Sequence, residues 1–108
     1  MKKAFEILWA AAAEMDLLET IEYIADDNSG AALKVLSRIK ASTARLDYSP
    51  KRGRIVPQLK KYGMSRYREI VIKSLRVFYR IQDNKVYIVS VIDGRRNVED
   101  ILFEKLLR

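Results

Sequence analysis

The chain has 108 residues and a formal net charge of +7 at pH 7, and it contains neither cysteine nor histidine. The lack of cysteine excludes a disulfide framework and thiol chemistry, and the lack of histidine removes the commonest general base and the commonest zinc ligand. At this length the sequence predicts one domain over residues 1–108, with no metal site and no cofactor.

Charge is unevenly distributed along the chain. Residues 1–50 carry a net charge of −2, whereas residues 51–108 carry +9. A basic half beside a mildly acidic half indicates that the C-terminal half binds a polyanionic or acidic partner. The simpler alternative is a soluble basic protein without a nucleic-acid role.

The first segment, residues 2–9, is predicted to form a strand at a sheet edge. Met1-Lys2-Lys3 and the apolar run behind it superficially resemble a signal peptide, but Glu6 interrupts that run and a helical pattern follows directly. No stretch approaches the ~20 apolar residues of a membrane span. We therefore expect a cytoplasmic protein without a membrane partner.

Two amphipathic helices are predicted next, over residues 10–26 and 30–48, because apolar residues recur at helical spacing in both. Acidic residues concentrate near the start of the first helix, as the helix dipole prefers. Asn28 or Ser29 can cap the second helix. A five-residue connection makes the pair an antiparallel hairpin, and one flank of the hairpin must cover a sheet.

A basic loop, Lys51-Arg52-Gly53-Arg54, follows the helix stop at Ser49-Pro50. Residues 55–59 are predicted to be a short extended segment, with Pro57 keeping it out of a central strand.

Residues 67–96 predict three antiparallel strands joined by two-residue turns at Lys73-Ser74 and Asp83-Asn84. These turns decide which side chains share a face. The face predicted to lie under the helices holds Ile70, Ile72, Leu75, Val77, Tyr79, Ile81, Val86, Ile88 and Ile92. The other face, predicted to be the open working surface, holds Tyr67, Glu69, Val71, Arg76, Phe78, Arg80, Tyr87, Val89 and Val91.

A final helix is predicted after Asn97, which can cap it, with an apolar stripe from Val98 to Leu107. The order of elements predicts an α+β fold: an N-terminal strand, an antiparallel helical hairpin, a curved, mostly antiparallel sheet built on a three-strand meander, and a C-terminal helix.

This order and several motifs resemble the RelE/ParE toxins of bacterial type II toxin–antitoxin modules. The motifs are the Asp47–Pro57 loop, Leu75-Arg76-Val77-Phe78-Tyr79-Arg80 and Gly94-Arg95-Arg96, and the resemblance covers essentially the whole chain. It implies a toxin of a plasmid or chromosome stabilisation module, neutralised by a cognate antitoxin in a hetero-oligomer. The antitoxin is expected to lay an amphipathic helix or strand on the helical hairpin and the sheet edge.

The resemblance implies two possible targets. RelE-like members are ribosome-dependent mRNA endonucleases, and ParE-like members poison DNA gyrase by contact. Arg76 and Arg96 match arginines of the nuclease pattern and are its candidate catalytic residues. The nuclease pattern also has two basic residues, at positions that Glu69 and Val71 occupy here. It has a tyrosine at the position of Leu102. A carboxylate repels phosphate, and we expect Glu69 to pair with Arg76 or Arg80.

The sequence thus favours gyrase inhibition, with the mRNA endonuclease as the alternative and a non-toxic basic nucleic-acid-binding module as a third reading. An enzymatic activity is expected only in the endonuclease branch. Candidate contacts to the target or to nucleic acid are Lys51, Arg52, Arg54, Arg80, Tyr87, Arg95 and Arg96. Candidate C-terminal contacts to the target are Lys105 and Arg108.

Overall fold

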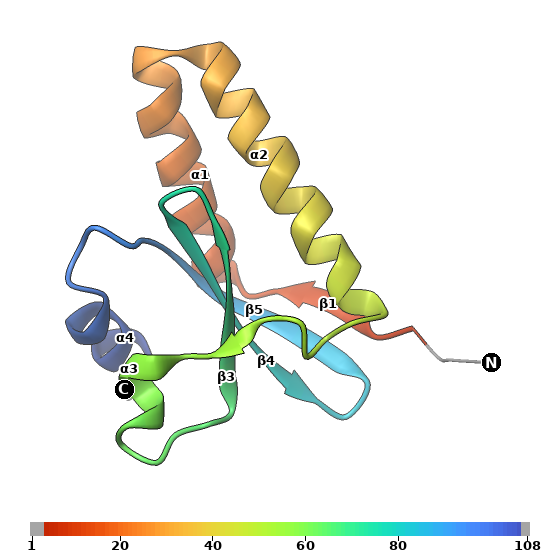
Figure 1. Ribbon diagram of the computed structural model, residues 1–108. Helices are drawn as coiled ribbons and strands as arrows, with labels where there is room; N and C mark the ends of the chain where they lie inside the picture. Colours follow the sequence, from red (N-terminus) through yellow and green to blue (C-terminus); the bar gives the residue numbers. More distant parts are fainter. Residues whose placement is uncertain (1–3, 107–108) are drawn as a thin grey trace.

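The computed structural model describes residues 4–106, and its α+β architecture confirms the predicted fold class (Figure 1). Within these residues, five strands form one sheet in the order β1-β5-β4-β3-β2, in which only the edge strand β1 runs parallel to its neighbour, β5. The elements in chain order are β1 Glu6–Trp9, α1 Ala11–Asp27, α2 Ser29–Ala44, the 3-10 helix η1 Arg45–Asp47, β2 Arg54–Ile55, α3 Pro57–Lys60, β3 Tyr67–Ile72, β4 Leu75–Gln82, β5 Lys85–Asp93 and α4 Val98–Leu106.

The helical hairpin is tighter than predicted. Asn28 alone separates α1 from α2, so the five-residue connection is wrong. Its backbone N–H donates to the Ile24 carbonyl at the end of α1, while its side chain accepts from the Ala31 N–H at 3.0 Å. One residue therefore caps both helices. α2 also ends earlier than predicted, because the chain tightens into η1 after Ala44.

Both turns of the meander lie where the sequence predicts them. Ile72 pairs with Leu75 across Lys73-Ser74, and Gln82 pairs with Lys85 across Asp83-Asn84. The first residue of each turn adopts a positive φ of 56°.

The predicted faces are correct up to Ile88 and wrong beyond it. Tyr79 pairs with Ile88, but Phe78 pairs with Ser90, so Val89 is an extra residue in β5. This β-bulge reverses the alternation of side chains downstream. Val91 consequently packs with the helical hairpin and Ile92 packs on the opposite face, whereas the sequence pattern predicts the reverse.

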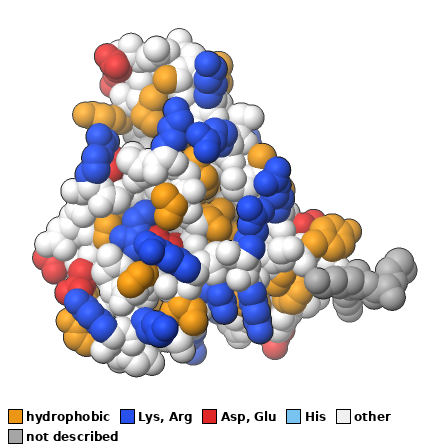
Figure 2. Space-filling view, viewed as in Figure 1, with side chains coloured by type: hydrophobic (Ala, Val, Ile, Leu, Met, Phe, Trp, Pro, Cys, Tyr) orange, Lys and Arg blue, Asp and Glu red, His pale blue; other side chains and the backbone are white. Residues whose placement is uncertain are grey.

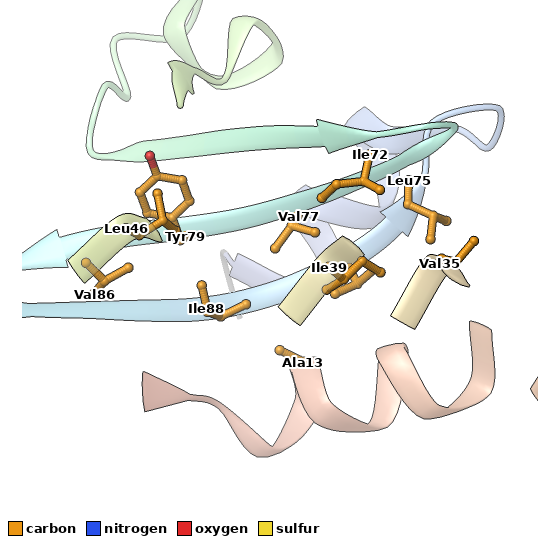
Figure 3. Close-up of a cluster of buried hydrophobic side chains, with 11 residues drawn as sticks. Ala13, Val35, Ile39, Leu46, Ile72, Leu75, Val77, Tyr79, Val86 and Ile88 are labelled. Atoms are coloured by element: carbon orange, nitrogen blue, oxygen red, sulfur yellow. The ribbon is translucent and has the colours of Figure 1, made fainter. Parts of the chain in front are cut away.

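The hairpin covers one face of the sheet and builds the first core. Figure 3 shows Ala13 of α1 with Val35 and Ile39 of α2, facing Val77 and other apolar side chains of the strands. Beyond the sheet, the hairpin continues as a projecting pair of helices (Figure 1).

The opposite face carries a second core, so the prediction of an open working surface is wrong. Phe78 and Ile92 are fully or almost fully buried there, beneath α3 and α4, and the buried Leu102 joins this core from α4. The prediction of an extended segment over residues 55–59 is also wrong. Only Ile55 belongs to a strand, and Pro57 stands in the first turn of α3, where its fixed φ and missing N–H are tolerated.

Candidate target-contact surface

Glu69 and Arg76 form a buried ion pair on the α3 side of the sheet. Glu69 lies on β3 and Arg76 on β4, diagonally across the same face. The guanidinium donates from Nε to one carboxylate oxygen of Glu69 and from Nη2 to the other. Arg76 also donates to Gln58 Oε1 at 2.8 Å, and Arg54 Nε donates to Glu69 at 3.1 Å.

The predicted pairing of Glu69 with Arg76 is therefore confirmed. The Glu69 side chain is inaccessible to solvent and that of Arg76 is 10% exposed. A bidentate pair of this kind satisfies both groups inside the protein and leaves the Arg76 guanidinium engaged. Arg76 Cζ also lies 5.2 Å from the centroid of the Phe78 ring, in a cation–π contact.

Arg96, the other arginine of the nuclease pattern, lies elsewhere. It is exposed in the turn after β5 and lines a groove of about 1080 Å³ between α1, the end of β5 and α4. Arg95 lines the same groove, and Arg76 does not. Of the positions where the nuclease pattern expects a polar side chain, Leu102 is fully buried and Val71 is 55% exposed.

Arg95 is held by a local ion pair. Its guanidinium donates to Asp93 at 2.6 and 3.0 Å. These hydrogen bonds lower the pKa of the Asp93 carboxyl and raise that of Arg95. Arg95 nevertheless keeps an exposed side chain at the rim of the groove.

The candidate contact Lys105 is engaged within the protein. Its ammonium donates to both carboxylate oxygens of Asp16 at 2.7 Å and to Ser90 Oγ at 3.2 Å. Lys105 therefore ties α4 to α1 and β5. Arg108 and the predicted stripe residue Leu107 lie outside the described residues.

The basic loop is anchored to the sheet by Tyr79, a feature that sequence reasoning missed. The Tyr79 phenol donates to the Pro50 carbonyl at 2.7 Å and accepts from the Gly53 N–H at 3.0 Å. Burial raises the pKa of this phenol. A Cβ at Gly53 would lie 2.5 Å from the Tyr79 oxygen, so only glycine fits there. Arg68 fastens the other side of the loop by donating to the Gly53 carbonyl at 2.8 Å.

The remaining candidate target contacts differ in whether their side chains interact with other residues of the protein. Lys51 and Arg52 are exposed in the anchored loop. Arg80 lies over the ring of Tyr87, with Cζ 4.4 Å from the ring centroid, and donates to Gln82. The structure thus brings Arg80 and Tyr87 together, and it separates both from the groove that Arg95 and Arg96 line.

A family model described as the ParE toxin of the type II toxin–antitoxin system parDE matches residues 7–98. No curated protein sequence matches the chain. Among the residues that the structure describes, no helix is both long and apolar enough to cross a membrane.

Solved structures share the fold at low sequence identity. A chain of the chromosomal ParDE system from P. aeruginosa matches with a TM-score of 0.68 and 16% identity, over 83% of this chain and 96% of its own. A mutant of the E. coli toxin RelE in the free state matches with a TM-score of 0.60 and 19% identity, over 97% of both chains.

Proposed function

Because the chain belongs to the ParE toxin family of type II toxin–antitoxin systems, we propose that it arrests bacterial growth by inhibiting DNA gyrase and is neutralised by a cognate antitoxin. Its place of action is then the cytoplasm. The observation that carries the choice of target is the buried pair of Glu69 and Arg76.

This pair argues against phosphodiester cleavage at the sheet face. Cleavage that uses the 2′-hydroxyl needs cations free to stabilise the charge that develops on phosphate. Arg76 is already bound to a carboxylate, and a phosphate approaching it would meet the negative charge of Glu69. Inhibition by surface contact needs no such site.

The target is tested by inducing the chain in bacteria and following two readouts together. We expect DNA breaks and an SOS response before any cleavage of transcripts, and loss of supercoiling when purified toxin is added to gyrase. Co-expression of the neighbouring antitoxin gene is the control and should restore growth. Cut transcripts without early DNA damage would identify the mRNA endonuclease instead, and normal growth with soluble full-length chain would contradict the toxin assignment.

The antitoxin is proposed to dock where β1 leaves a free sheet edge beside the helical hairpin. An apolar groove of about 360 Å³ lies there, between Trp9 of β1, Leu17, Leu18 and Ile21 of α1, and Leu36 of α2. Leu18 is 52% exposed, although it is a large apolar side chain. An amphipathic antitoxin segment that covers this groove would bury the exposed surface, and an extended one would also pair with the β1 backbone.

We expect Leu18→Asp to weaken antitoxin binding by at least about tenfold, because a carboxylate in a buried apolar contact costs more than about 1.4 kcal/mol. Isothermal titration calorimetry with purified antitoxin measures the effect. Leu33→Asp is the matched control, since Leu33 is 67% exposed and lies outside the groove. In cells, the Leu18 variant should stay toxic and escape neutralisation. Equal weakening by both variants would contradict the docking site.

A further inference from the structure

We propose that the toxin contacts the phosphate backbone of duplex DNA directly, through a basic face that runs along α2 and over the anchored loop. The inference goes beyond gyrase inhibition, because it gives the toxin a DNA contact of its own. The basic face comprises Lys34, Arg38, Arg45, Lys51, Arg52 and Arg68.

The α2 part of this face is a stripe along one side of the helix. At about 100° per residue, Lys34 and Arg38 lie about 40° apart on the circumference of α2. Arg45, the C-cap residue of α2 and the first residue of η1, continues the row of cations at the end of the helix. The buried residues of α2, among them Val35 and Ile39, lie beside this stripe and face the sheet. Lys40 lies on the opposite flank, in the antitoxin groove beside α1.

The loop follows α2 in the chain, directly after η1. Tyr79, which belongs to the core under the hairpin, holds Pro50 and Gly53 at the β2 edge of the sheet. Arg68 reaches the loop from β3 by donating to the Gly53 and Lys51 carbonyls. The loop cations are thus presented on a fixed backbone beside the end of α2.

These charges are not neutralised by the protein's own carboxylates. Among the described residues, none of the six cations forms an ion pair within 4.0 Å. The acidic residues of the hairpin all lie on α1, which carries six carboxylates, whereas α2 carries none. Figure 2 shows Lys and Arg side chains spread over the face that bears α2 and β2, with few acidic side chains among them.

The shape of the basic face favours duplex over single-stranded nucleic acid. Single strands are bound in grooves with aromatic stacking platforms. Neither of the two cavities described above includes a residue of the basic face. Along the helix axis, Lys34 and Arg45 are about 16 Å apart, which corresponds to roughly half a turn of B-DNA.

The test is fluorescence anisotropy of a short labelled DNA duplex with the full chain, purified free of antitoxin, at several salt concentrations. We expect measurable binding at low salt that weakens steeply as salt rises, because bound cations displace the counterions of the phosphates. Lys34→Gln should weaken binding and lower the slope of log K against log salt by about 1, and Lys34→Gln combined with Arg38→Gln by about 2.

Lys40→Gln is the matched control, because it makes the same substitution on the same helix and removes the same charge from the opposite flank. It should leave affinity and slope close to those of the unchanged chain, and equal thermal midpoints would show that all variants are folded. The proposal is overturned if the chain does not bind the duplex at low salt, if Lys40→Gln has the effect of Lys34→Gln, or if single-stranded RNA binds more tightly than the duplex. Because binding to bare DNA is measured without gyrase, this result is independent of the target assay.

Discussion

At the scale of single residues, Tyr79 shows that a sequence pattern can place a side chain in the core without revealing the hydrogen bonds that its polar group makes there. The sequence pattern correctly places Tyr79 on the face under the helices, as one more apolar residue. Its hydroxyl, however, joins the Pro50 carbonyl and the Gly53 N–H, which lie 29 and 26 residues earlier in the chain. That partnership depends on how the loop crosses the sheet edge, so the alternation of residues in β4 could not reveal it.

We expect Tyr79→Phe to destabilise the fold by about 1–3 kcal/mol at pH 7, because it leaves the buried Gly53 N–H and the Pro50 carbonyl without this partner. Urea unfolding measures the change. Tyr48→Phe is the control, since Tyr48 is 55% exposed, and it should have little effect.

The same pair of variants tests the pH dependence. Burial raises the folded-state pKa of Tyr79, so this contribution to stability is complete below the unfolded pKa of about 10 and is lost as pH rises above it, through the folded pKa. The unchanged chain and Tyr48→Phe should therefore lose stability more steeply above pH 10 than Tyr79→Phe does. A parallel loss of stability in all three proteins would contradict the assignment of this pH dependence to Tyr79.

At the scale of elements, the bulge in β5 depends on a side chain from the other end of the chain. Asp16 of α1 accepts from the Val91 N–H at 3.0 Å, from Ser90 Oγ at 2.8 Å and from Lys105 of α4. Local turn chemistry was enough to predict both hairpin turns. It could not predict the bulge, because the acceptor that stabilises it is 75 residues away. The sequence likewise suggested that Lys105 could contact the target, because its partner Asp16 is distant in the chain.

We expect Asp16→Ala to destabilise the protein by about 2–3 kcal/mol, since it removes the acceptor of a backbone N–H and the partner of a partly buried ammonium. Glu22→Ala, which removes an exposed carboxylate from the same helix, is the control and should change stability by less than about 0.5 kcal/mol. Thermal unfolding followed by circular dichroism measures both. Similar midpoints for the two variants would show that the network is dispensable.

At the scale of the whole molecule, the hairpin separates two kinds of surface. The acidic helix α1 borders both grooves, whereas the basic helix α2 begins the basic face. The proposed antitoxin groove and the proposed DNA contact therefore lie on different flanks of the same two helices. The uneven net charge indicated a polyanionic partner for the C-terminal half, and the proposed DNA contact adds Lys34, Arg38 and Arg45 from the N-terminal half.

The fold class, the edge strand and the family were predictable because the order of elements and the turn residues carry them. The covering of the second sheet face could not be predicted in the same way, because it depends on Pro57 starting the helix α3, whereas the sequence pattern suggested an extended segment. The short helix α3 brings Leu59 into the second core and Gln58 onto Arg76.

The burial of β4 on both faces has a consequence for how such toxins can diverge. Although Gln82 at the end of β4 is exposed, residues 75–79 are all buried, alternately under the hairpin and on the side of α3 and α4, so this part of the strand has no side that faces water. New target or partner preferences cannot be acquired there without disturbing one of the two cores. Variation is left to the outer flanks of α1 and α2 and to the loops.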